Sequence, residues 1–184
     1  MTAVTVAHLA AVLVAAIGAF TDWRWERIPN WLTFGAGGSA LLGHGLAGGT
    51  GGLLHAGSGL LACGLVPAIM FYLPLKDGQR PMHGGDVKMF AALGALLGPF
   101  VGIECQLYAL CFAAIVALVR LAWEGKLLRT LGNVAVLVGN VVRRADRRRP
   151  APEALATVRL GVPIFLGTTI GVALNSPELL SWIP

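Results

Sequence analysis

Charged side chains are scarce in this chain. Lysine, arginine, aspartate and glutamate make up 12% of its 184 residues, whereas 56% of the residues are hydrophobic. Soluble domains carry about 25% charged residues and roughly 45–50% apolar ones. So few polar groups do not cover a water-facing globule of this size, and the apolar content excludes a disordered chain. The composition therefore indicates an integral membrane protein.

Cysteine is also scarce, and its placement excludes a disulfide framework. Cys63, Cys105 and Cys111 form no Cys-x-x-Cys pair and no zinc-ribbon spacing, and all three lie in apolar stretches. Cysteine in such stretches is most often a small packing residue. We expect no metal and no cofactor. The net charge of +5 is explained by membrane topology and by contacts with anionic lipid, so no nucleic-acid partner is expected.

Long apolar runs are what the chain has in abundance. About 20 mostly apolar residues cross a bilayer as a helix, and these continuous runs lack the alternation of a membrane barrel. The first run has no basic residue before it and is followed by TDWRWER. This order is the reverse of a signal peptide, so we expect a retained span. Spans are predicted at roughly 3–21, 31–49, 53–75, 87–103, 105–123 and 159–176. The fourth and fifth share one apolar stretch, which is divided at Gly98-Pro99 through Glu104 because no single helix spans that length.

The basic residues predict the orientation of these spans. All 14 lie in or beside the connections between spans one and two, three and four, and five and six. The positive-inside rule places these connections in the cytoplasm and both termini on the other side. We therefore expect an all-α membrane protein with six transmembrane helices, forming one membrane-embedded domain over residues 1–184. Its largest extramembrane piece is a basic cytoplasmic connection at about 124–158.

Two of the nine acidic residues stand apart from the others. Asp22 directly follows the first span and Asp86 directly precedes the fourth, so the topology places both at the cytoplasmic edge. An ionisable group at that boundary is a functional candidate. Two carboxylates that share a proton are the apparatus of aspartic proteolysis, in which one accepts a proton from water and the other donates to the scissile carbonyl. An ion-coupled transporter or a structural pair explains the same placement.

The residues beside each aspartate favour a built site. Asp22 opens the stretch DWRWERIPN, in which Pro29 can occupy the first turn of the next span and Asn30 can cap its exposed amides. Asp86 lies in HGGDVK.

In that second stretch, Gly84 and Gly85 permit unusual backbone conformations and a close approach, so an extended substrate strand fits beside Asp86. Lys88 either tunes the charge near Asp86 or marks the membrane edge.

These two stretches resemble the type IV prepilin peptidases, a family of GxGD intramembrane aspartyl proteases. The first family motif is an aspartate, a short basic stretch and Ile-Pro-Asn, as in Asp22 to Asn30. The second is Gly-x-Gly-Asp followed by Val-Lys, matched by Gly85-Asp86-Val87-Lys88. The resemblance implies that Asp22 and Asp86 are catalytic. It further implies prepilin or pseudopilin substrates, whose short basic leader is cleaved after a glycine at the cytoplasmic face of the bacterial inner membrane.

Two departures from the family pattern qualify the resemblance. His83 stands where the first motif glycine is expected, so either Gly84 supplies the flexibility or activity is altered. His83 either modulates the ionisation of Asp86 or points to solvent, and a peptidase-like assembly scaffold with an impaired site is an alternative. The chain also lacks the insertion with paired Cys-x-x-Cys motifs found in larger members. It thus resembles the short, peptidase-only form of tight-adherence (Flp) pili, which implies cleavage without N-methylation.

Overall fold

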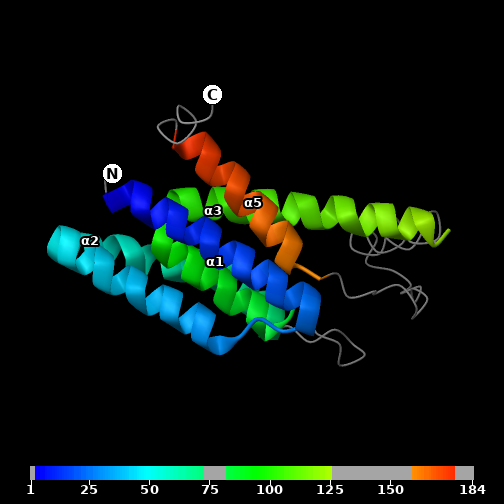
Figure 1. Cartoon of the computed structure of the whole chain (residues 1–184), viewed down its shortest axis with the longest axis horizontal. Coiled ribbons are helices and arrows are strands. Elements are labelled where there is room, and N and C mark those ends of the chain that lie inside the picture. Colours follow the sequence, from blue (N-terminus) through cyan, green and yellow to red (C-terminus); the bar gives the residue numbers. More distant parts are fainter. Residues whose placement is uncertain (1–2, 73–81, 126–158, 177–184) are drawn as a thin grey trace, which may run out of the picture. The chain divides into compact units, whose positions relative to one another are not determined.

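The computed structural model describes residues 3–72, 82–125 and 159–176. Every regular element in these ranges is an α-helix, which confirms the predicted all-α class. In chain order the helices are α1 (Ala3–Trp25), α2 (Asn30–Tyr72), α3 (Gly84–Trp123) and α5 (Gly161–Asn175) (Figure 1).

A glycine interrupts each of the two long helices. Gly49 in the 43-residue α2 has φ 59° and ψ −138°, and Gly98 in the 40-residue α3 has φ 77° and ψ 177°. Residues with a β-carbon rarely adopt these angles. The interruptions fall at two of the predicted breaks between spans. Both breaks are shorter than predicted, because the chain is helical again directly after each glycine and residues 99–104 form no connection.

Three of the helices, α1, α2 and α3, are long and apolar enough to cross a membrane, and the apolar α5 has 15 residues. Only 22–33% of the most apolar window of each long helix is buried. Leu46 and Phe100, for example, are 89% and 85% exposed. Lipid covers such a surface, whereas a soluble monomer seldom exposes it. The helices therefore support a membrane protein, while the six crossings and the side of each terminus remain predictions.

Small residues let α2 and α3 approach almost backbone to backbone. A β-carbon on Gly59 would overlap the carbonyl group of Gly94, and one on Gly94 would lie 2.7 Å from the β-carbon of Cys63. Close packing of this kind drives helix association in lipid, where the hydrophobic effect between helices is absent. Cys63 and Cys105 are buried, as expected of packing residues, whereas Cys111 is exposed.

The short helix α5 lies beside α1 (Figure 1). One hydrogen bond runs from the Gly161 N–H to Asp22 Oδ2, at 3.0 Å. Another joins His8 Nδ1 and Ser176 Oγ, at the opposite ends of the two segments. Because the start of α5 contacts the end of α1 and the residue after α5 contacts the beginning of α1, the two helices are antiparallel.

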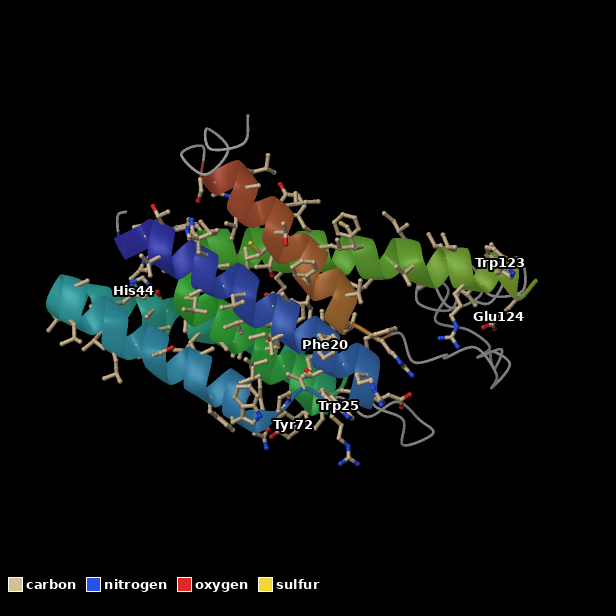
Figure 2. The ribbon with its side chains drawn as sticks, in the orientation of Figure 1. Phe20, Trp25, His44, Tyr72, Trp123 and Glu124 are labelled. Atoms are coloured by element: carbon tan, nitrogen blue, oxygen red, sulfur yellow. The ribbon has the colours of Figure 1, made fainter. Side chains whose placement is uncertain are left out.

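The chain divides into two compact units, Met1–Phe112 with Arg159–Pro184, and Ala113–Val158. In the second unit the last turns of α3 are described, and they end at Gly125, whose φ is 66°. Arg120 Nε donates to Glu124 Oε1 at 3.1 Å near this end, where Figure 2 labels Trp123 and Glu124. Beyond Gly125, the predicted basic connection lies outside the described residues.

Candidate active site

Asp22 lies in the last turns of α1 and Asp86 in the first turn of α3. The helix α1 continues to Trp25 and α3 begins at Gly84, so both aspartates belong to helices rather than to the connections predicted beside the spans. Asp86 is 4% exposed, and Asp22 is half-buried. The two carboxylates are near enough to interact electrostatically. The structure thus brings together the two acids that the sequence singles out.

Two further contacts join the stretches that carry these aspartates. A β-carbon on Gly85 would lie 3.3 Å from the β-carbon of Ile28, so Gly85 is packed against the segment that follows Asp22. Lys88 Nζ donates a hydrogen bond to Asn30 Oδ1 at 2.8 Å. The second motif therefore contacts the first through residues on both sides of Asp86 in the sequence.

The two glycines before Asp86 act by their size. Gly84 and Gly85 open α3, and neither is among the described glycines with a positive φ. The conformational freedom that these glycines permit is therefore not used as a positive φ in this structure. The expected close approach is present at Gly85, where Ile28 takes up the space. An extended substrate strand beside Asp86 stays a prediction.

Pro29 and Asn30 form the junction between the connection and α2. The helix begins at Asn30, and the Pro29 carbonyl accepts a hydrogen bond from the Leu32 N–H at 3.2 Å, so Pro29 precedes the first turn rather than occupying it. Asn30 Oδ1 is engaged by Lys88, so its predicted capping role is replaced by a link to α3. Lys88 Nζ also lies 5.2 Å from the centroid of the Phe34 ring. Lys88 thus serves as a tie between α3 and α2.

His83, which replaces the first motif glycine, contacts both solvent and Asp86. Its side chain is 67% exposed, and its Nδ1 lies 4.0 Å from Asp86 Oδ2. Its carbonyl accepts a hydrogen bond from the Asp86 N–H at 3.1 Å, which opens the first turn of α3. We predicted that this side chain either modulates Asp86 or points to solvent. The ring is exposed to solvent and also within ion-pair distance of the Asp86 carboxylate, so the geometry is compatible with both.

Exposed aromatic side chains surround this end of the helices. Trp23, Trp25 and Trp31 are exposed, and they lie at the end of α1 and the start of α2. Figure 2 shows Trp25 and Tyr72 at one end of the helices and His44 towards the other. Tryptophan and tyrosine concentrate at membrane–water interfaces. The sequence itself carries this signal, because the three tryptophans lie at or beside the connection between the first two predicted spans.

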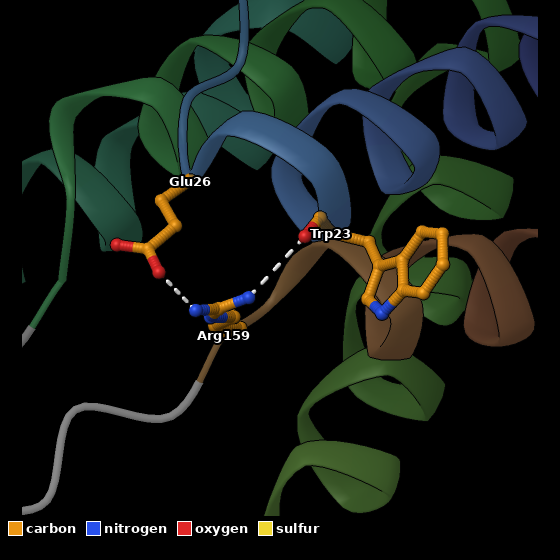
Figure 3. A network of polar contacts seen from close by, with 3 residues as sticks. All are labelled: Trp23, Glu26 and Arg159. Carbon is orange, nitrogen blue, oxygen red and sulfur yellow. Dashed lines mark hydrogen bonds and ion pairs between the residues drawn. The ribbon is translucent and has the colours of Figure 1, made fainter.

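Sequence reasoning missed two residues that contact the α1 end of the site. Gly161 donates its N–H to Asp22 Oδ2 at 3.0 Å. Arg159, which the sequence analysis assigned to topology alone, forms an ion pair with Glu26 and donates to the Trp23 carbonyl at 3.3 Å (Figure 3). No local pattern signals either contact, because the hydrogen bond from Gly161 joins residues 139 positions apart.

The chemistry available at this site is that of two carboxyl groups. Within residues 3–72, 82–125 and 159–176, no group of three or more His, Cys, Asp or Glu side chains is placed to hold a metal ion. A pair of interacting carboxyls with different surroundings suits general acid–base work, in which one accepts a proton while the other donates one.

Comparison with known protein families gives a match over more than half of the chain. The model of the type IV leader peptidase family matches residues 9–118, which include most of α1, all of α2 and most of α3. This range contains both aspartates and ends before α5. No curated protein and no solved structure matches the chain significantly.

Proposed function

The chain belongs to the type IV leader peptidase family, and we propose that it is a membrane aspartic endopeptidase with Asp22 and Asp86 as its catalytic pair. Its proposed substrates are prepilins or pseudopilins, from which it removes a short basic leader. The observation that carries this proposal is the contact between the two stretches that hold the aspartates. Gly85, beside Asp86, packs against Ile28, and Lys88 donates a hydrogen bond to Asn30.

The proposed reaction needs one proton shared between the two carboxyls. The ionised carboxylate takes a proton from a water molecule as the water oxygen attacks the scissile carbonyl carbon. The protonated carboxyl donates its proton to the carbonyl oxygen, which gives a tetrahedral diol. As the diol collapses, one of its hydroxyls returns a proton to the carboxylate that protonated the carbonyl oxygen, and the carbon–nitrogen bond breaks. The leaving amine takes a proton from the other carboxyl, which had been protonated by the attacking water. One peptide bond and one water are thus consumed, and a new carboxyl and a new amine result.

The position of the pair suits a substrate cut where a leader meets an apolar helix. The exposed tryptophans beside Asp22 support a site at the boundary between lipid and water. Arg24 and Arg27 follow Asp22 directly, which under the positive-inside rule supports the cytoplasmic face of a bacterial inner membrane. A basic leader lies on that same face, so its junction with the apolar helix reaches the depth of the two carboxyls.

Co-expression with a prepilin tests this proposal. Wild type is expected to remove the leader, visible as a gel shift, and Asp22→Asn and Asp86→Asn each to lower the rate by at least about a thousandfold. Glu104→Gln is the matched control, because it makes the same carboxyl-to-amide change on α3, where Glu104 Oε2 accepts a hydrogen bond from Asn175 at 2.6 Å. Sequencing the first residue of the product locates the cut and shows whether that residue is methylated.

The outcomes also separate the two alternatives. Normal processing by both aspartate variants contradicts the assigned pair. A small ion-coupled transporter predicts solute flux that depends on Asp22 and Asp86 without any leader cleavage. An assembly scaffold with an impaired site predicts that wild type is inactive and that His83→Gly, which restores the motif glycine, cleaves.

A further inference from the structure

We infer that the residues opening α5, Arg159 and Gly161, position the catalytic Asp22 for the reaction. This inference rests on the proposed function. The family match ends at residue 118, so it assigns no role to this segment. Both residues act through α1, which makes them positioning residues rather than catalytic ones.

The first support is the fit of Gly161 against Asp22. Its N–H donates to Asp22 Oδ2 at 3.0 Å. A β-carbon on Gly161 would lie 2.6 Å from the β-carbon of Asp22 and 2.7 Å from Oδ2, closer than real β-carbons approach other atoms. The position of Asp22 therefore leaves no space for a side chain at residue 161, so only glycine fits there. With Oδ2 bound, rotation of the carboxyl group about its Cβ–Cγ bond is restricted.

The second support is the set of contacts that Arg159 makes with the end of α1. Its guanidinium donates to the Trp23 carbonyl at 3.3 Å and forms an ion pair with Glu26, as Figure 3 shows. The Trp23 carbonyl belongs to the last turn of the helix, where backbone carbonyls lack partners and a cation is favourable. Arg159 thus contacts two residues that follow Asp22 in the sequence, one in the last turn of α1 and one directly after the helix.

The backbone at this point depends on that turn. Glu26 has φ 56°, a left-handed conformation that is uncommon for residues with a β-carbon, and its N–H bonds to the Asp22 carbonyl at 3.0 Å. This is the αL ending of a helix, and Asp22 is the residue whose carbonyl closes it. Arg159 and Glu26 are 51% and 70% exposed, and an ion pair so exposed adds little stability. We therefore assign this ion pair to orienting the last turn of α1 rather than to stabilising the fold.

Positioning matters because a misplacement of about 1 Å at a reacting group costs a rate on the order of 100-fold. Gly161→Ala keeps the N–H but forces Asp22 to move away from the new β-carbon. We expect kcat per folded molecule to fall at least about tenfold while KM stays unchanged, because the substitution displaces a carboxyl that acts in the chemical step. The assay uses the full chain in detergent micelles and a peptide with a Lys/Arg-rich leader ending in glycine, followed by about 20 apolar residues.

Matched variants separate positioning from packing. Gly171 lies on the same helix as Gly161. Gly171→Ala places a β-carbon against Sγ of Cys105 in α3, so it strains the packing of α5 without touching Asp22. Gly35→Ala adds a β-carbon in open space. Both are expected to keep the wild-type kcat per folded molecule, although Gly171→Ala lowers the melting temperature.

A second variant keeps the inference testable if Gly161→Ala does not fold. Arg159→Met retains the apolar stem and removes the charge and donors, and we expect kcat to fall several-fold with KM unchanged. Arg120→Met is its control, because Arg120 is likewise about half exposed, at 54%, and forms its ion pair with Glu124, four residues further along the chain.

The outcomes distinguish this inference from the proposed function. Wild-type kcat in both Gly161→Ala and Arg159→Met overturns the inference, while an inactive Asp22→Asn leaves the proposed function standing. An equal loss of kcat in Gly171→Ala also overturns it, because the loss then follows helix packing. A wild-type enzyme that does not cleave the peptide overturns the proposed function and the inference together.

Discussion

At the scale of single residues, the packing around the two aspartates depends on neighbouring glycines that have no β-carbon. Gly85 has no β-carbon, and Ile28 packs into that space. Gly161 has none either, and Asp22 fills the corresponding position. A glycine thus permits close packing beside each aspartate. Gly85 belongs to the second motif, and Gly161 lies far from both motifs in the sequence.

The contact between Gly85 and Ile28 gives a residue-scale prediction. In Gly85→Ala the new β-carbon lies 3.3 Å from that of Ile28, so one helix end must shift by a few tenths of an ångström. We expect kcat for leader cleavage to fall roughly three- to tenfold, since such a shift separates Asp86 from Asp22. In Gly84→Ala the nearest atom, on the Phe71 ring, is 3.5 Å away, an ordinary contact, so a smaller loss is expected. Equal kcat values in the two variants contradict this account.

At the scale of elements, the two glycine interruptions set the helix boundaries that the sequence predicted. An apolar stretch of 40 or more residues exceeds one span, and Gly98-Pro99 combines a flexible residue with one that lacks an N–H, so a break was predictable there. The helix ends near the aspartates were less predictable. Hydropathy marks where lipid ends rather than where hydrogen bonding ends, so α1 continues past residue 21 to Trp25 and α3 begins before residue 87 at Gly84.

The contacts of α5 were beyond prediction for a different reason. Charge placement assigned Arg159 to one side of the membrane, and it did so without naming its partners. The approach of Gly161 to Asp22 depends on how α5 packs on α1, and neither residue's own neighbours record that packing. The pairing of Asp22 with Asp86 was predictable because two motifs and the order of spans placed both at one edge. Gly161, which also contacts Asp22, lies in no such motif.

The interruptions at Gly49 and Gly98 give an element-scale prediction about the free energy of unfolding. Both glycines have backbone angles that cost about 1–3 kcal/mol for other residues. A β-carbon on Gly49 meets nothing within 4 Å, whereas one on Gly98 overlaps the His55 ring on α2. Gly49→Ala is therefore expected to cost about 1–3 kcal/mol, and Gly98→Ala distinctly more.

Unfolding in detergent measures both variants, with Gly38→Ala as the control because its β-carbon meets nothing within 4 Å and its φ is not positive. Adding His55→Ala to Gly98→Ala is expected to recover only the part of the loss due to overlap. Equal costs at the two interruptions would show that the His55 contact has no influence on stability.

At the scale of the whole molecule, the scarcity of charge links topology to function. All 14 basic residues lie in or beside three of the five predicted connections, and the two aspartates lie at the edge that those connections define. The exposed tryptophans at the same helix ends support that edge as an interface by an independent kind of residue. The proposed substrate has a basic leader in water and a helix in lipid, so the proposed site at this edge would meet the junction between the two.

This topology predicts opposite accessibility for two positions in α1–α2. The connection with Arg24 and Arg27 is expected inside the cell, and the interruption at Gly49 outside the inner membrane. Single cysteines are introduced as Arg27→Cys and Gly51→Cys, since both positions are exposed and a β-carbon on Gly51 meets nothing within 4 Å. The exposed Cys111 is replaced by alanine in both, and the buried Cys63 and Cys105 remain.

In cells with a permeable outer membrane, a membrane-impermeant maleimide is expected to label position 51 at once and position 27 only after the inner membrane is opened. Labelling of position 27 in intact cells would place Asp22 on the far side of the membrane from a cytoplasmic leader, and the proposed cleavage at the cytoplasmic face would then be wrong.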